Sequence, residues 1–253
     1  MILLKSRNEI EHMRAASGIV AEILAEVRRH VRAGVTTADL DAVAEEWIHK
    51  KQAKPAFKGY SVGGGPFPAC ICLSINDEVV HGIPSRKRTL REGDIIGLDF
   101  GVCYQGYFGD AAVTVPVGPV APEARRLIDV TERSLEAAIG AVRPGAHIGD
   151  IGAAVQDVVE AAGYSVVREF VGHGIGRRLH EDPQVPNYRT GARGPRLTEG
   201  MVLAIEPMVN AGKAEVYLRD DGWTAATRDG RLSAHFEHSV AVTSDGPYIL
   251  SLP

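Results

Sequence analysis

The sequence contains little cysteine and no spacing that would build a disulfide framework. Only three of its 253 residues are cysteine, Cys70, Cys72 and Cys103. Without a Cys-x-x-Cys pair or an even set, a small disulfide-rich secreted fold is excluded, and a reducing cytoplasm is the expected localisation. Cys70 and Cys72 are predicted to be small apolar side chains in a strand, and half of a metal site is the alternative.

Long apolar runs are missing as well. The N-terminal stretch MILLKSRNEIEHMRAA has four apolar residues before Lys5 and then becomes charged. This is too short for the apolar core of a signal peptide. No stretch approaches the roughly 20 apolar residues that a membrane span requires. We therefore expect no membrane partner.

The chain also lacks an excess of charge of either sign. It has 28 Lys and Arg against 32 Asp and Glu, which gives a net charge of -4. Nucleic acid is therefore not expected as a partner. A hydrophobic share of 45% in 253 residues is ordinary for a globular protein of one large domain or two small ones.

Helical and strand-like segments follow one another in two similar blocks. Ser6 and Glu9 form a capping-box pattern ahead of a helix that Gly34 is expected to stop, and Thr36 or Thr37 is expected to cap the next helix. Short β-branched stretches follow at 69–75, 94–102 and 111–117. The helical pattern returns from Pro122, and strand-like stretches follow it to the end.

Three pairs of segments resemble one another in the same order along the two blocks. The pairs are 31–46 with 142–157, 81–84 with 173–176, and 90–99 with 197–206, at separations of 111, 92 and 107. This repeat predicts one catalytic domain, 1–253, built from two halves of about 1–120 and 121–253. We expect the halves to pack about a pseudo-twofold axis with a cleft between them. Hairpin-length links favour an α+β fold with an antiparallel sheet.

The last pair of repeated segments places Asp99 and Glu206 at equivalent positions. Each carboxylate ends an otherwise apolar run and should be largely buried. Buried charges are normally paired or bound to metal.

Asp110 lies on the predicted hairpin that also carries Asp99. A turn at Gln105-Gly106 places Asp110 diagonal to Asp99, whereas a turn at Tyr104-Gln105 places the two directly opposite. In either register two like charges come within reach of each other, which is destabilising without a cation between them. An exposed sheet face with solvated aspartates is the alternative.

A fourth carboxylate, Glu237, lies in the predicted strand 233–243, on the same face as His235 and Ser239. Glutamate is disfavoured inside strands. Four strand-borne carboxylates together with a histidine suit a pair of divalent ions better than a lone structural zinc.

At these residues the sequence resembles the type I methionine aminopeptidases. The segments that carry the resemblance are 76–85, 98–114, 172–188, 200–208 and 236–243, and the likeness runs from about Lys5 to Tyr248. The ligand pattern is shared by the wider pita-bread hydrolases, including prolidases and aminopeptidase P. The segment NDEVVHGIP is more specific to methionine aminopeptidases.

The resemblance implies a pita-bread fold, in which helices cover a curved antiparallel β-sheet. It also implies two divalent metal ions, Co, Mn, Fe or Zn, with Asp110 and Glu237 bridging them. The implied metal ligands are Asp99, Asp110, His173, Glu206 and Glu237. Glu206 is the expected general base, and His81 and His180 are implied to bind the substrate.

The implied activity is removal of the initiator methionine from nascent polypeptides whose second residue is small, by attack of a metal-bound hydroxide. The expected partners are the N-termini of nascent chains, with the ribosome as one candidate place of encounter. A monomer is expected. The rival interpretations are a prolidase-type peptidase, a non-catalytic binding module of the same fold and a redox di-iron protein.

Two features depart from the family pattern. The loop 59–70 is a few residues longer than the usual form, and Leu179 stands where many members carry an aromatic residue. Candidates for the methionine pocket are Phe67, Cys72, Leu179 and Trp223.

The remaining histidines, His12, His30, His49, His147 and His235, are expected to be solvated or to cap helices, and His238 is expected to pack beside the site.

Overall fold

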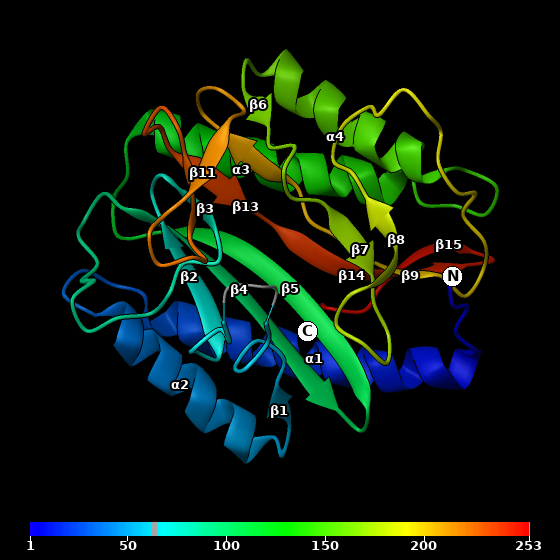
Figure 1. The fold of residues 1–253 in the computed structure, drawn as a ribbon, viewed down its shortest axis with the longest axis horizontal. Coiled ribbons are helices and arrows are strands. Elements are labelled where there is room, and N and C mark those ends of the chain that lie inside the picture. The colour runs from blue at the N-terminus through cyan, green and yellow to red at the C-terminus, as the bar shows by residue number, and fades with distance from the viewer. Residues whose placement is uncertain (62–64, 253) are drawn as a thin grey trace.

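The structure, a computed structural model, describes residues 1–61 and 65–252. Two blocks of helices followed by strands are visible in Figure 1. The first block contains α1 (Arg7–His30), α2 (Thr37–Lys50), β1 (Lys54–Pro55), β2 (Ile71–Ile75), β3 (Glu78–Val80), β4 (Ile95–Tyr104) and β5 (Tyr107–Pro116). The second begins with α3 (Pro122–Gly140), α4 (Ile148–Ala161), β6 (Ser165–Val166), β7 (Gly172–Gly174), β8 (Glu181–Val185) and β9 (Val202–Ile205). It ends with β10 (Met208–Asn210), β11 (Val216–Leu218), β12 (Ala225–Thr227), β13 (Ser233–His235), β14 (Glu237–Thr243) and β15 (Gly246–Ile249).

The helices begin where the sequence predicts and follow the predicted repeat. Ser6 forms a full capping box with Glu9, and Thr36, rather than Thr37, caps α2. The expected end of α1 at Gly34 is wrong, because the backbone already becomes extended at Val31. α2 and α4 begin 111 residues apart, which is the separation found in the sequence. The predicted division near residue 120 falls in the link between β5 and α3.

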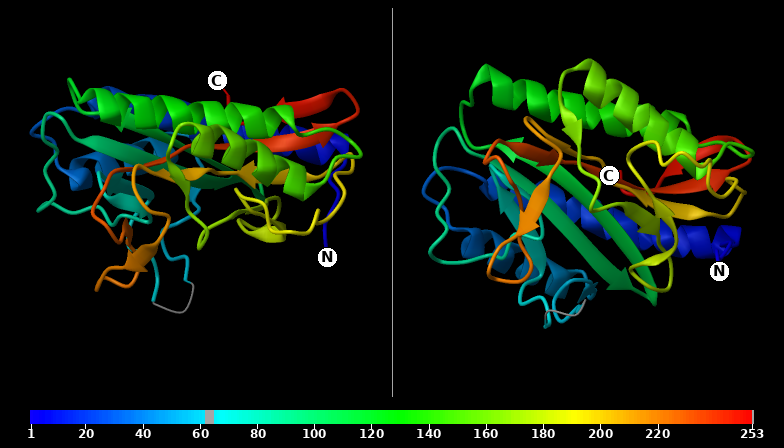
Figure 2. Two further views of the ribbon diagram at one scale, coloured as in Figure 1. Left: turned by 90° about the horizontal axis from the view of Figure 1, so that it is seen from above. Right: turned by 45° about the horizontal axis from the view of Figure 1, so that its top comes forward.

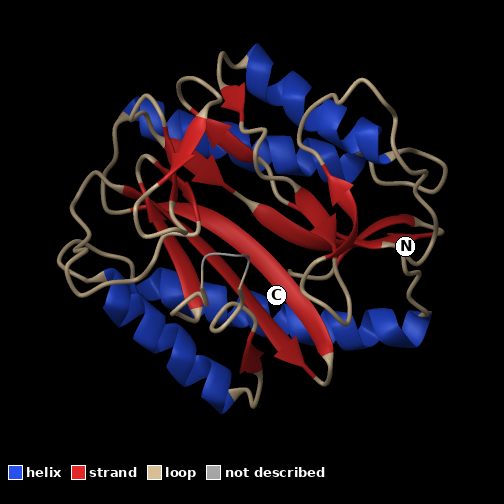
Figure 3. Cartoon of the chain, viewed as in Figure 1, coloured by secondary structure: helices blue, strands red, loops and turns tan. Residues whose placement is uncertain are grey.

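A nine-stranded sheet organises the molecule, and every pairing in it is antiparallel. Its strand order is β1-β4-β5-β14-β9-β7-β8, with β2 added on β4 and β15 on β14. β4 and β5 form the long curved hairpin that crosses the centre of Figure 3. β14 joins the two halves, because it pairs with β5 on one side and β9 on the other.

Alternation along the strands of the first half separates apolar from acidic side chains. On β4, Ile96, Leu98 and Phe100 are fully buried and pack in the core that α1 and α2 form. Side chains on a strand alternate between the two faces of its sheet. Asp99 therefore lies on the face away from those helices.

The second half repeats this arrangement. Leu203 and Ile205 of β9 and Val240 of β14 pack in a core that α3 and α4 cover. Figure 2 shows α1 and α3 along one face of the sheet, while the β11–β12 hairpin projects on the other. The helices therefore cover the apolar face and leave the acidic face to the loops.

The predicted strand 233–243 is interrupted at Phe236. β13 joins β10 and β6 in a separate three-stranded sheet, whereas β14 joins the large sheet. The interruption lies directly before Glu237. The sequence-based prediction of one continuous strand is therefore wrong.

Cys70 and Cys72 are buried and free, as expected of small apolar side chains. Within residues 1–61 and 65–252, no helix is both long enough and apolar enough to cross a bilayer.

Candidate active site

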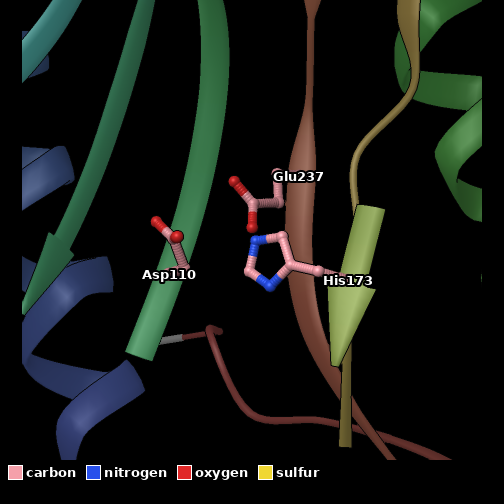
Figure 4. Close-up of side chains that lie close together, drawn as sticks. All are labelled: Asp110, His173 and Glu237. Carbon is pink, nitrogen blue, oxygen red and sulfur yellow. The ribbon is translucent and has the colours of Figure 1, made fainter. Parts of the chain in front are cut away.

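Three predicted ligands meet at the centre of the large sheet. Asp110 of β5, His173 of β7 and Glu237 of β14 each offer a ligand atom, and these atoms lie within 4.8 Å of one another. Figure 4 shows the three side chains pointing toward one another from different strands. All three are buried. Residues that are 127 apart in the sequence are therefore assembled by strand pairing.

The β4–β5 register places Asp99 beside this cluster. Asp110 is opposite Gly101, and Tyr104 is opposite Tyr107. The turn is therefore at Gln105-Gly106, and Asp110 is diagonal to Asp99. Asp99 lies in the middle of β4, within the predicted strand-like stretch 94–102.

Glu206 directly follows β9. Its Oε1 lies 3.5 Å from Nε2 of His173. Asn187 donates a hydrogen bond from Nδ2 to the Glu206 carbonyl oxygen at 3.0 Å and so fixes the backbone there. All five predicted ligands therefore lie on or directly beside strands of the same sheet.

The orientation of His173 leaves one nitrogen free to bind a cation. Nδ1 lies 2.9 Å from the carbonyl oxygen of Gly174. A carbonyl can only accept, so Nδ1 carries the proton and Nε2 presents a lone pair toward Glu206. This backbone contact is the usual way in which a metal-binding imidazole is oriented.

The glycines around His173 allow the neighbouring backbone to come close. A Cβ on Gly172 would lie 2.3 Å from the carbonyl oxygen of Ala204, and a Cβ on Gly174 would lie 2.1 Å from that of Asp182. These glycines therefore let β7 fit between β8 and β9.

Burial and mutual repulsion disturb the ionisation of the four carboxyl groups. Burial raises the pKa of Asp99 to about 7. It also raises the pKa of Asp110 well above its usual range, and the nearby Asp99 charge adds to this effect. The pKa values of Glu206 and Glu237 are raised for the same two reasons. The cluster therefore strongly favours a positive partner.

The donor set fits a divalent cation. Oδ1 of Asp110 and Oε1 of Glu237 are buried and find no hydrogen-bond partner among the residues described. Asp110 is 4% exposed and Glu237 3%, which excludes the alternative of a solvated acidic face. Four carboxylates and one imidazole are ligands that Mn²⁺, Fe²⁺, Co²⁺ and Zn²⁺ accept.

His81 and His180 lie at the edge of the cluster. The ring centroid of His180 is 4.2 Å from that of His173, and Nδ1 of His180 is 2.7 Å from the Tyr60 hydroxyl. His81 has a positive φ of 61° and packs edge-on against Phe170. Burial and the nearby His180 lower the pKa of His81 to about 4. The His81 ring is therefore uncharged at neutral pH, with a proton on only one of its two nitrogens.

A cavity of about 530 Å³ opens above the cluster. Its lining includes all four candidates for the methionine pocket, Phe67, Cys72, Leu179 and Trp223, together with the predicted ligands. Phe67 and Trp223 pack edge-on with ring centroids 5.2 Å apart. Residues 62–64 of the long loop lie outside the described residues.

Several residues of this region were not predicted to belong to it, among them Tyr60, Phe170 and His235. Tyr60 and Phe170 line the cavity, but single aromatic residues in loops carry no distinctive sequence signal. His235 was expected to be solvated. It is 3% exposed, and its Nε2 lies 3.8 Å from Oε2 of Glu206, because the interruption at Phe236 turns β13 into the interior.

The other histidines lie away from the cluster. His49 is exposed and His30 bonds its own helix, while His147 precedes α4. His12 stacks on Tyr107, and His238 contacts the Ser251 hydroxyl.

Comparison with known proteins assigns this arrangement to a family. Residues 11–244 match the model of metallopeptidase family M24. The chain belongs to this family. As a member of family M24 it is a metal-dependent peptidase and therefore a hydrolase.

Relatives match over the full length. The methionine aminopeptidase of Clostridium acetobutylicum is 51% identical over 100% of this chain and 99% of its own length. Methionine aminopeptidase 1 of Bacillus subtilis is 47% identical over 99% of both chains. The crystal structure of methionine aminopeptidase from Thermotoga maritima has a TM-score of 0.96 at 46% identity and covers 100% of both chains. The predicted resemblance to methionine aminopeptidases is thus confirmed.

A prolidase from Pyrococcus furiosus shares the fold alone. It has a TM-score of 0.78 at 21% identity, and the match covers 99% of this chain but 65% of the prolidase. Together the two solved structures confirm the predicted pita-bread fold.

Proposed function

We propose that this M24 member removes the N-terminal methionine of nascent polypeptides whose second residue is small. The observation that carries the proposal is the buried cluster of carboxylates and one imidazole at the base of a cavity with apolar walls. The full-length similarity to methionine aminopeptidases supports the choice of methionine.

The five predicted ligands, Asp99, Asp110, His173, Glu206 and Glu237, would hold two divalent ions. Asp110 and Glu237 would be among the residues that hold them, because each has a buried oxygen without a hydrogen-bond partner among the residues described. When bound, the ions would supply a water of lowered pKa and a Lewis acid for the scissile carbonyl.

The remaining steps belong to side chains of the chain itself. Glu206 has its carboxylate partly exposed at the cluster, so it can accept the proton of the attacking water and return it to the leaving nitrogen. His180 would donate a hydrogen bond to the developing oxyanion. His81, held by Phe170 on one side and Trp223 on the other, would bind the amide beyond the scissile bond.

The lining of the cavity supports both parts of the proposed specificity. Phe67, Cys72 and Trp223 form an apolar cluster suited to an unbranched thioether side chain. His81 and Phe170 also line the cavity, with ring centroids 5.4 Å apart, and would leave space for only a small second residue beside them.

A panel of Met-X-Ser tripeptides tests this proposal through the release of free methionine. We expect turnover with X as Ala, Gly or Ser, and none with X as Ile or Lys. Equal rates for Ala and Lys would show a broader aminopeptidase. Faster cleavage of Ala-Pro peptides would show a proline-directed enzyme like the prolidases that share the fold.

A further inference from the structure

The loop that carries His180 is supported from outside the cavity. Residues 175–180 connect β7 to β8 and form no regular structure. Ile175 and Leu179 pack with Ile10 and Met13 of α1 in one apolar cluster. The N-terminal part of the chain therefore forms the back wall of this loop.

An ion pair lies within this back wall, directly beside His180. Nζ of Lys5 is 2.7 Å from Oε2 of Glu181, and the two side chains are 6% and 2% exposed. Glu181 is the next residue after His180 and begins β8. The second oxygen of Glu181, Oε1, accepts a hydrogen bond from the backbone nitrogen of Arg178 at 3.1 Å. Glu181 thus closes the turn in which His180 lies.

Lys5 itself has little freedom to move. Its backbone nitrogen donates to the carbonyl oxygen of Gly200 at 2.7 Å, and its ammonium also donates to that of Leu3 at 3.0 Å. A Cβ on Gly176 would lie 2.6 Å from Cε of Lys5, so the lysine stem lies directly against the loop backbone. The ammonium is therefore a fixed point to which Glu181 is attached.

A buried ion pair is costly to desolvate and is weak evidence for stability alone. Its geometry here suits a different role. The pair joins the N-terminal segment to the residue next to His180, and the loop has no other buried charge to hold it.

We propose that Lys5 is a positioning residue, which acts through Glu181 to hold His180 at the edge of the cavity. The proposal rests on the proposed role of His180 in the peptidase reaction. Lys5 is not among the residues that line the cavity, and its contacts with Glu181 and Gly176 give its effect a route through the loop.

The main test uses the double variant Lys5→Met/Glu181→Gln. It removes both charges and leaves neither partner buried as an unpaired ion. We expect kcat on Met-Ala-Ser to fall by about 10-fold to 100-fold, because a displacement of about 1 Å can cost about 100-fold. KM and metal content should stay unchanged. If this variant does not fold, Glu181→Asp, which keeps both charges but shortens the side chain that reaches Lys5, should lower kcat by a smaller factor.

A His180→Ala background separates positioning from general damage. There the double substitution should lower kcat no further, because the group that it positions is already absent. An equal loss of kcat in both backgrounds would overturn the proposal. Lys51→Met, which removes the exposed ion pair between Lys51, directly after α2, and Glu22 of α1, is the control and should leave kcat unchanged in both backgrounds.

A second measurement needs no substrate. Amide hydrogen exchange of residues 176–182 should be faster in the double variant than in the wild type or in Lys51→Met. Unchanged exchange would contradict the proposal even if activity fell. If exchange is faster in the double variant but the wild type itself releases no methionine, the role of Lys5 in holding the loop would be supported and the proposed peptidase function rejected.

Discussion

The floor of the cavity and its rim are built differently. The floor consists of carboxylates on β4, β5 and β14, where ladder hydrogen bonds fix the position of every residue. The rim consists of His81, at a positive φ, and His180, in an irregular loop. A strand ladder holds ligands to a fixed spacing, whereas a loop holds a side chain only as firmly as the contacts behind it. Loss of a floor residue should therefore cost more activity than loss of a rim residue.

The largest expected effect is that of Asp110→Asn. It removes a buried charge that the bound cations would neutralise. Loss of an outer-shell partner typically costs about 10-fold to 100-fold in metal affinity or activity, and loss of a ligand should lower kcat/KM by more than the roughly 10³-fold that one oxyanion donor can contribute. Peptidase assays at saturating Mn²⁺ measure it. Asp157→Asn, at an exposed ion pair on α4, is the control. Near-native turnover in the Asp110 variant would remove this residue from the metal centre.

His180→Ala should have a smaller effect that is confined to the chemical step. Loss of one oxyanion donor typically lowers kcat by about 10²-fold to 10³-fold. Metal content, measured by elemental analysis, should remain that of the wild type. A large loss of bound metal would make His180 a ligand and would erase the distinction between rim and floor.

Tyr60→Phe should have a smaller effect again. It deletes the hydroxyl that bonds Nδ1 of His180 at 2.7 Å. A neutral hydrogen bond contributes about 1 kcal/mol, so we expect kcat to fall by roughly fivefold while methionine affinity holds. Tyr188→Phe, which deletes a hydroxyl on the exposed Arg168 carbonyl contact, is the matched control. A wild-type kcat in Tyr60→Phe would show that the hydrogen bond does not orient His180.

The smallest effect should appear in stability, and with the opposite sign. In metal-free protein, Asp110→Asn replaces a buried carboxyl, which the neighbouring Asp99 charge repels, with a neutral amide. We expect a small rise in Tm, at roughly 2–4 °C per kcal/mol. Added Mn²⁺ should raise the Tm of the wild type but not of the variant. A lower Tm for the metal-free variant would mean that the floor is not under charge repulsion.

The same division explains how much could be predicted from sequence. Asp99, Asp110 and Glu206 were predictable because carboxylates inside apolar strand patterns are conspicuous, and a period of two fixes their face. The repeat also predicted the starts of α2 and α4, and their observed separation agrees with it. These are local patterns that tertiary packing seldom alters.

The rim of the cavity and the surroundings of Glu206 were less predictable from sequence. His235 was expected to be solvated and is buried beside Glu206. The reason is that the predicted strand is interrupted at Phe236, so that β13 belongs to a different sheet from β14. Tyr60 reaches His180 across 120 residues of sequence, and no short-range pattern encodes such a contact. The division of the chain into halves at residue 120 stays a prediction.

The most direct test of the central claim is metal analysis of protein purified anaerobically, with Met-Ala-Ser hydrolysis measured on the same sample. Chelation should abolish hydrolysis, and re-addition of Mn²⁺ or Fe²⁺ should restore it in proportion to the metal bound, up to about two ions per chain. Asp110→Asn should bind less metal under the same conditions. Full hydrolysis in a sample that contains no metal would contradict the claim that this carboxylate cluster holds the ions of a peptidase.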